Sequence, residues 1–233
     1  MAGPLPDQPL ISIIIPVLNE ADCLDQTLKN LLHRQWVKDH CEIIVSDGGS
    51  YDGSPEIARR HPCKLIHSDT GRARQMNTAS RNARGQVLLF LHADSILPDN
   101  FGDLIATQGD WGFFRLRLSA DSFAYRVIES AINLRTRISK VAGGDQCLFF
   151  RRRFFEAFGG FPEIPLMEDI AISKKARQLA APLIIETAVT SSSRRWQQQG
   201  IVKTVLLMWS LRLAFWLGVN PARLHRIYYP QRG

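Results

Sequence analysis

Cysteine is scarce in this sequence, and internal repeats and low-complexity tracts are absent. The four cysteines among the 233 residues are widely separated and form no Cys-x-x-Cys pair: Cys23, Cys41, Cys63 and Cys147. This spacing argues against a disulfide framework and is typical of a reducing compartment. We therefore expect a cytoplasmic protein.

The sequence also lacks a secretory signal and an uninterrupted membrane span. Residues 1–9 contain three prolines and no apolar run behind a basic start, so we expect a flexible leader. Residues 201–219 are apolar almost all round, but Lys203 and Arg212 interrupt them. A spanning helix needs about 20 predominantly apolar residues, and a central charge is costly. We expect this helix to pack on the core or on a second copy of the chain, or to lie peripherally at the inner membrane face.

Length and charge limit the remaining possibilities. A chain of 233 residues with 45% hydrophobic content can bury one sizeable core. We therefore expect one domain over residues 10–200, followed by an apolar helix and a basic aromatic tail over 201–233. The formal net charge of +7 favours an anionic partner, such as nucleotide phosphate, anionic lipid or nucleic acid. No basic stripe interleaved with aromatic residues supports nucleic acid.

Apolar runs alternate with helical patterns in the first half of the chain. Residues 10–17, 41–47, 64–67 and 87–91 read as strands, and their spacing predicts βαβ units with a parallel sheet. Residues 87–91 are apolar without alternation, as in a strand covered on both faces. Asp94 follows that strand, at the edge where open α/β sheets bind ligands. Alternatively, Asp94 caps the helix that Pro98 introduces.

The pattern changes after Pro98. Residues 111–118 alternate from Phe114 onward, which predicts a half-exposed antiparallel strand. A helix follows over about 123–138. We expect its Val127, Ile128, Ala131 and Leu134 to face the core, and its Arg126, Arg135 and Arg137 to face water.

Five short motifs follow one another between Ser12 and Ser173. They are Ile13-Ile-Ile-Pro-Val-Leu-Asn-Glu20, Val45-Ser-Asp-Gly-Gly-Ser50, Leu91-His-Ala-Asp-Ser-Ile-Leu-Pro98, Phe158-Gly-Gly-Phe-Pro162 and Glu168-Asp169. In this order they resemble the nucleotide-sugar glycosyltransferases of family 2, the inverting group with the GT-A fold. The resemblance implies a GT-A-like α/β domain, with a mainly parallel sheet flanked by helices and a C-terminal apolar helix. It also implies a glycosyltransferase that moves a sugar from a nucleoside diphosphate donor to a hydroxyl acceptor.

The resemblance also implies the donor site. Its residues would be Pro16, Asn19, Glu20, Asp47, Gly48, Arg72, Gln75, His92, Ala93 and Asp94. Asp94 would hold a divalent cation, Mg²⁺ or Mn²⁺, because hard cations favour oxygen ligands. His92 departs from the family, because the first acid of its Asp-x-Asp motif would stand there. Its imidazole either contacts the ligand or is a satisfied strand-end histidine.

The motifs near the C-terminal end of the domain imply the acceptor side. Asp169 would be the general base, or alternatively an ordinary acid at a helix start. The other acceptor-side candidates are Gly144, Asp145, Gln146, Glu168, Arg195 and Trp196. Arg195-Trp196 is similar to the Gln-x-x-Arg-Trp motif of processive members, but Ser192 occupies the Gln position. This departure argues against polymer synthesis.

Two other functions fit parts of the sequence. A nucleotidyltransferase acting on a sugar phosphate uses a similar sheet, but it needs a glycine- and Lys-rich phosphate loop after the first strand, and Pro16-Val-Leu-Asn-Glu20 is not one. A noncatalytic module that binds nucleotide sugars or anionic lipid is favoured by charge alone.

Overall fold

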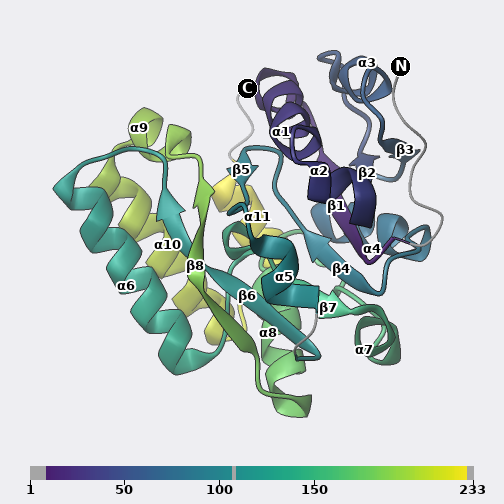
Figure 1. The fold of residues 1–233 in the computed structure, drawn as a ribbon. Helices are drawn as coiled ribbons and strands as arrows, with labels where there is room; N and C mark the ends of the chain where they lie inside the picture. Colours follow the sequence, from purple (N-terminus) through teal and green to yellow (C-terminus); the bar gives the residue numbers. More distant parts are fainter. Residues whose placement is uncertain (1–8, 107–108, 230–233) are drawn as a thin grey trace.

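A mixed sheet runs through the computed structural model, which describes residues 9–106 and 109–229. Within these residues the strands lie in the order β3-β2-β1-β4-β7-β6-β8-β5 (Figure 1). Their bounds are β1 Ile11–Val17, β2 Cys41–Asp47, β3 Lys64–His67, β4 Val87–Phe90, β5 Ser95–Ile96, β6 Trp111–Leu118, β7 Phe149–Arg151 and β8 Leu183–Ser191. The first four are parallel, as predicted, so β1, β2 and β3 end at the same edge.

Helices cover both faces of the sheet. They are α1 Ala21–Leu32, α2 Gln35–His40, α3 Ser54–Arg59, α4 Arg72–Arg81, α5 Phe101–Ala106, α6 Phe123–Ser139, α7 Arg152–Ala157, α8 Glu168–Leu179, α9 Arg194–Gln199, α10 Ile201–Trp216 and α11 Pro221–Tyr228, with the 3-10 helix η1 at Gly144–Gln146. Figure 1 shows α1 to α3 near one end of the sheet, and α6 and α10 beside β6 and β8 at the other.

The apolar run in β4 is buried because both faces of the sheet are covered. Val87, Leu89 and Leu91 pack in a cluster that includes residues of α1, α2 and α5. Leu88 and Phe90 pack in a second cluster, which includes residues of α4, α7 and α8. The absence of alternation in residues 87–91 therefore reports burial on two sides, as expected from the sequence.

Strand β6 is buried except at Arg115 and Arg117, so the expected alternation is present from Phe114 onward, and its pairing is mixed. It pairs antiparallel with β7 at Trp111 and Gly112 and parallel with β8 from Gly112 to Leu118. The expectation of an antiparallel strand was thus correct for one neighbour and wrong for the other. Strand β7 is short, so no strand forms hydrogen bonds with the backbone of β6 beyond Phe114 on that side.

Helix α6 satisfies this backbone with polar side chains. Leu116 N–H donates to Asn133 Oδ1 at 2.8 Å, Asn133 Nδ2 donates to Leu116 O at 2.9 Å, and Leu118 N–H donates to Glu129 Oε1 at 2.5 Å. A buried N–H or C=O without a partner would cost about 1–3 kcal/mol, so the polar face of α6 turns inward.

The expected orientation of α6 is therefore wrong. Of the residues expected inside, Val127, Ala131 and Leu134 are exposed, and Ile128 is only half-buried. Of the arginines expected in water, Arg126 and Arg135 are half-buried and Arg137 is exposed. The error arises because periodicity assigns the apolar stripe to the core, whereas this helix lies along a sheet edge that needs hydrogen-bond partners.

Helices α10 and α11 pack on the elements that carry the Glu-Asp motif. Leu211 and Leu224 are buried in a cluster with Val141, Met167 and Ile170. The C-terminal segment is therefore in contact with the rest of the domain. Among the described helices, none has the length and apolarity required to traverse a bilayer.

Candidate functional site

The loops that follow β1 and β2 hold each other by hydrogen bonds. Asn19 N–H donates to Ser50 Oγ at 2.9 Å, and Tyr51 N–H donates to Asn19 Oδ1 at 3.0 Å. Asn19 adopts the left-handed conformation, with φ of 57°, which Asn tolerates better than most residues. Glu20 N–H donates to Ser54 Oγ at 3.0 Å. The two loops therefore form one wall at the carboxyl edge of the sheet.

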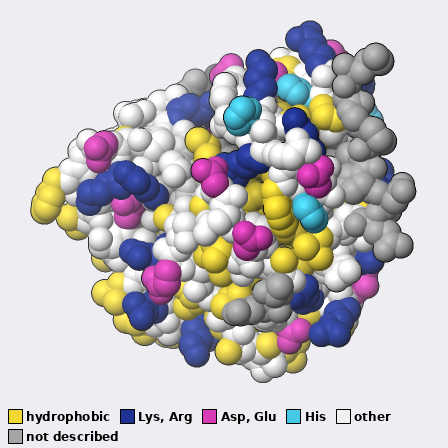
Figure 2. Space-filling model, viewed as in Figure 1, with side chains coloured by type: hydrophobic (Ala, Val, Ile, Leu, Met, Phe, Trp, Pro, Cys, Tyr) yellow, Lys and Arg dark blue, Asp and Glu magenta, His cyan; other side chains and the backbone are white. Residues whose placement is uncertain are grey.

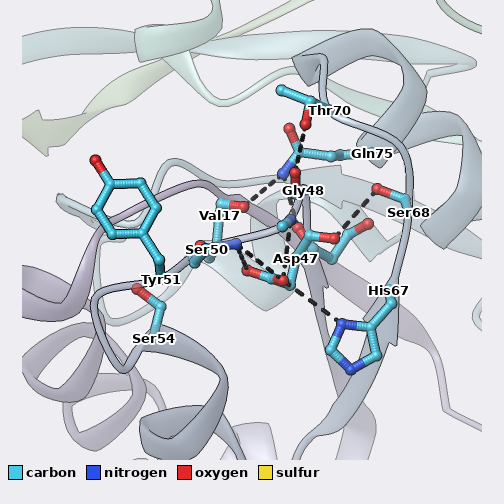
Figure 3. Close-up of polar contacts among 12 residues, drawn as sticks. Val17, Asp47, Gly48, Ser50, Tyr51, Ser54, His67, Ser68, Thr70 and Gln75 are labelled. Atoms are coloured by element: carbon cyan, nitrogen blue, oxygen red, sulfur yellow. Dashed lines mark hydrogen bonds and ion pairs between the residues drawn. The ribbon is translucent and has the colours of Figure 1, made fainter.

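Asp47, at the end of β2, holds the turn of this wall together (Figure 3). Its buried carboxylate accepts hydrogen bonds from Gly49 N–H at 3.0 Å and Ser50 N–H at 3.2 Å. His67 Nδ1 lies 3.5 Å from Asp47 Oδ2. The contact of Asp47 with a nucleoside stays a prediction.

Gln75 supports the same wall from α4 (Figure 3). Its Nε2 donates to Val17 O at 2.7 Å and to Ser46 O at 2.9 Å, so one buried amide ties the ends of β1 and β2 together. A Cβ at Gly48 would lie 2.9 Å from Gln75 Cδ. Gly48 is therefore the residue that lets the turn lie directly on the amide.

Asp94 and Glu20 form the acidic part of the site. Burial raises the pKa of Asp94, Glu20 raises it further, and Arg194 and Arg72 oppose both effects. Arg194 comes from α9, and its Nη2 lies 3.4 Å from Glu20 Oε2. The preceding residue Ala93 is buried, and its carbonyl accepts a hydrogen bond from Thr27 Oγ1 at 2.6 Å, which fixes the turn to α1.

A divalent cation fits this pair of carboxylates. In residues 9–106 and 109–229, no group of three or more His, Cys, Asp or Glu side chains is arranged so that it could hold a metal ion by itself. A Mg²⁺ site, however, commonly uses one or two protein carboxylates, with waters and substrate phosphates completing it. Burial and a neighbouring negative charge both disfavour ionised Asp94, and a bound cation would relieve both.

His92 lies between the donor side and the acceptor side. Burial, aided by Arg72, lowers its pKa to about 3, so the imidazole is neutral at physiological pH. A Cβ at Gly144 would lie 2.7 Å from His92 Nε2. His92 therefore packs closely against the loop that precedes β7.

One pocket brings many of the predicted residues together. Its lining includes Pro16, Arg72, Met76, Phe90, His92, Gly144, Leu148, Phe161, Glu168 and Asp169. These residues come from β1, α4, the end of β4, η1, the start of α8, and the segments that precede β7 and follow α7. Segments far apart in the sequence thus meet at one point.

Asp169 enters this pocket in a fixed orientation. Met167 precedes α8 in the left-handed conformation, with φ of 69°, and directs the chain into the helix. Gly144 N–H donates to Asp169 Oδ2 at 2.6 Å, and Ile170 N–H donates to Asp169 Oδ1 at 2.7 Å. The carboxylate is thereby held between the start of α8 and η1.

Glu168 has a different environment from its neighbour. Its side chain is 3% exposed, and Arg72 Nη1 lies 3.8 Å from Glu168 Oε1. Burial raises the pKa of Glu168 to about 7, the Asp169 charge adds to the rise, and Arg72 opposes it. The site thus contains two adjacent carboxyl groups that differ in burial.

Arg212 and Arg135 face the acceptor side of the site, although their sequence positions did not predict this. A Cβ at Gly143 would lie 3.3 Å from Arg212 Nη2 and 3.5 Å from Asp169 Oδ2, so Arg212 of α10 reaches this loop. Burial raises the pKa of Asp145, and Arg212 and Arg135 lower it. Burial and the nearby charge of Arg212 together lower the pKa of Arg135 to about 10. For Arg212, the sequence signal was its position in an otherwise apolar helix, because a charged side chain there requires a partner or water.

The other acceptor-side candidates have structural contacts. Buried Gln146 donates from Nε2 to Phe114 O at 3.2 Å. The guanidinium carbon of Arg195 lies 4.2 Å from the centre of the Tyr228 ring. Trp196 packs in a cluster with residues of β6 and α6. Acceptor contacts by these residues stay predictions.

Comparison with known proteins identifies the family. The model of Glycosyl transferase family 2 matches residues 12–108. Glycosyltransferase AglE from Haloferax volcanii is 34% identical over 176 residues, which cover 66% of this chain and 56% of that protein. The chain belongs to glycosyl transferase family 2. It spans about half the length of this relative.

Solved structures confirm the GT-A-like fold. The mannosyltransferase PcManGT from Pyrobaculum calidifontis, in complex with GDP-Man and Mn²⁺, has a TM-score of 0.65 at 22% identity, over 91% of this chain and 63% of that one. TarS 1-349 from S. aureus has a TM-score of 0.64 at 19% identity, over 78% of this chain and 60% of that one. At these identities the likeness concerns the fold alone.

Proposed function

We propose that this family 2 domain transfers a sugar from a nucleoside diphosphate to a hydroxyl acceptor with inversion and with the help of a metal ion. The observation that carries the proposal is the Asp169 carboxylate, which Gly144 N–H holds at 2.6 Å in a pocket shared with Arg72 and His92. A positioned base and cationic groups near the leaving phosphate are what this reaction requires.

The donor lies along the wall formed by the β1 and β2 loops. Its nucleoside contacts Glu20 and Asp47, and its diphosphate lies near Arg72 and Arg194. Arg194 already pairs with Glu20 at 3.4 Å. The PcManGT structure contains GDP-Man, and a TarS 1-349 structure contains UDP-GlcNAc, which supports a nucleotide-sugar donor here.

Asp94, with Glu20 nearby, holds the divalent cation. When bound, the cation neutralises charge on the diphosphate. Mn²⁺ in the PcManGT complex supports this assignment. His92 stays neutral because of its lowered pKa, so it adds no positive charge beside the metal.

Asp169 accepts the proton of the acceptor hydroxyl. The hydroxyl oxygen then forms a bond to the anomeric carbon while the bond from that carbon to the diphosphate oxygen breaks, and the electron pair leaves with the diphosphate. Attack from the face opposite the leaving group inverts the anomeric configuration. The two hydrogen bonds to the Asp169 carboxylate orient it before the acceptor arrives.

The proposal is tested by donor binding and turnover in the same samples. UDP-, GDP- and dTDP-sugars are screened by calorimetry with Mn²⁺ or Mg²⁺, and hydrolysis and transfer are then measured with the best donor. Asp169→Asn is expected to bind donor normally and to lower turnover by about 10²–10⁴-fold. The matched control is Asp103→Asn, an exposed acid in the first turn of α5, which is expected to leave turnover unchanged.

Three results would contradict the proposal. If no nucleotide sugar binds with either metal, the glycosyltransferase function is wrong. If Asp169→Asn retains substantial transfer, another group is the base. Donor binding without hydrolysis or transfer would favour a noncatalytic module.

A further inference from the structure

Two helices present apolar stripes to solvent. On α6 the exposed stripe is Phe123, Val127, Leu134 and Ile138, and on α10 it is Val202, Leu206, Trp209, Leu213 and Trp216. The α10 stripe recurs every three or four residues, and the α6 stripe recurs at steps of four, seven and four residues, so each stripe lies on one face of its helix. The side chains of Trp209 and Trp216 are 68% and 70% exposed. We call these two stripes the α6–α10 surface.

The two helices are neighbours. Ile128 and Ile132 of α6 pack in one cluster with Trp196 of α9 and Ile201 of α10. Farther along, Arg135 of α6 and Arg212 of α10 influence each other electrostatically. Figure 1 shows the helices running side by side, and Figure 2 shows hydrophobic side chains projecting at the margin where α6 lies. Aromatic and aliphatic exposure of this kind marks an interaction site.

The charge of this region is one-sided. The last acid in the sequence is Glu186, and residues 187–233 contain seven Lys and Arg, which equals the formal net charge of +7 for the whole chain. Lys203 of α10 and Arg223 and Arg226 of α11 are exposed. Arg194 and Arg212 face acids of the candidate site, so the positive charge available to this surface comes from Lys203, Arg223 and Arg226. A partner that is apolar and negatively charged would complement both the exposed stripes and these three side chains.

We propose that the α6–α10 surface docks on an anionic lipid bilayer, with α10 lying in the plane of the interface. Trp side chains favour the boundary between headgroups and acyl chains, and basic side chains attract anionic lipid. With 16 residues α10 is about 24 Å long, shorter than the hydrocarbon core of about 30 Å, so it fits along the interface.

A second copy of the chain is a poorer partner. A two-fold dimer places the same patch against itself, and here that would bring basic side chains together without an acid in residues 187–233 to pair with them. Anionic lipid supplies the missing negative charge. The proposal goes beyond sugar transfer and does not depend on it.

The test is co-sedimentation of the full chain with vesicles, without donor. Vesicles of phosphatidylcholine alone are compared with vesicles containing about 30% phosphatidylglycerol, and binding is expected only to the anionic ones and to weaken in high salt. The double variant Trp209→Ser with Trp216→Ser is expected to bind at least about tenfold more weakly. Its control is Leu179→Ser, an exposed apolar residue at the end of α8.

A charge variant and a spectroscopic readout complete the test. Lys203→Glu with Arg223→Glu is expected to abolish the preference for anionic vesicles, whereas Lys38→Glu in α2 is expected to retain it. Lipids brominated on the acyl chains are expected to quench the fluorescence of the wild type but not of the double Trp variant. Thermal melting of every variant verifies folding.

Several results would contradict the membrane proposal. Equal binding to neutral and anionic vesicles, or unchanged binding by the double Trp variant, would overturn the proposal. A wild-type protein that ignores vesicles and is dimeric by light scattering would assign the surface to a second copy of the chain. Donor binding is measured separately, so failure here leaves the proposed sugar transfer intact.

Discussion

Replacing Glu168 by Gln tests whether its buried carboxyl is protonated near neutral pH. Because the folded-state pKa is about 7 against 4.5 for the ordinary group, the folded protein holds this proton more tightly than the unfolded chain. The resulting stabilisation is present below about pH 4.5 and is lost as pH rises through about 7. Between about pH 5 and pH 8.5, the wild type should lose about 2–3 kcal/mol of unfolding free energy from this group.

Glutamine keeps the size of the side chain and does not titrate. The melting temperature of Glu168→Gln, relative to wild type, is therefore expected to rise by about 5–10 °C between those two pH values. Comparing the two proteins cancels the titration of groups that do not interact with Glu168. Glu56→Gln, at an exposed site in α3, is the control and should show no such trend. Parallel curves for Glu168→Gln and wild type would refute the argument that Glu168 is neutral in the folded site.

Three further predictions concern the metal, the pocket and the wall. Asp94→Ala is expected to abolish the effect of Mn²⁺ on donor affinity, and His92→Asp to strengthen it, both measured by calorimetry; a metal response that survives Asp94→Ala would place the cation elsewhere. Gly144→Ala puts a Cβ 2.7 Å from His92 Nε2 and should lower stability by about 1–3 kcal/mol in denaturant unfolding, and wild-type stability would show that the loop yields. Gln75→Leu removes the Nε2 donor from the buried carbonyls of Val17 and Ser46, although Val17 O keeps its hydrogen bond from Gly48 N–H, and it is expected to cost about 1–3 kcal/mol, whereas an unchanged midpoint would mean that water replaces the amide.

The sequence predicts the sheet well where burial dictates the pattern. The runs at 41–47 and 64–67 coincide with β2 and β3, because a strand covered on two faces or ending at a turn leaves a local signal. The site motifs are local too: Asn19 and Asp47 lie in turns that they help to form. The sequence pattern therefore predicts the structure correctly where the residues that determine it lie within one segment.

Orientation of α6 could not be predicted in the same way. The unpaired edge of β6 exists only because β7 ends early, and this is a property of the assembled sheet. Glu129 and Asn133 face inward to serve that edge, and the apolar residues of the helix turn outward as a consequence. Periodicity identifies the two faces of a helix, but it does not say which face the rest of the protein needs.

Helix α10 is a stronger example, because it is apolar on nearly every side. Its three sides have three environments: Leu211 lies in the core, Trp209 lies in solvent, and Arg212 lies near Asp145 and Asp169. An arginine in an apolar helix is costly unless it meets water or an acid, so the acceptor side helps to set the rotation of α10 and hence which residues point outward. A truncation that removes α10 would therefore take a cation from the acceptor side as well as the exposed tryptophans, and its loss of activity would say nothing about membranes. Point substitutions of the outward residues separate the two roles.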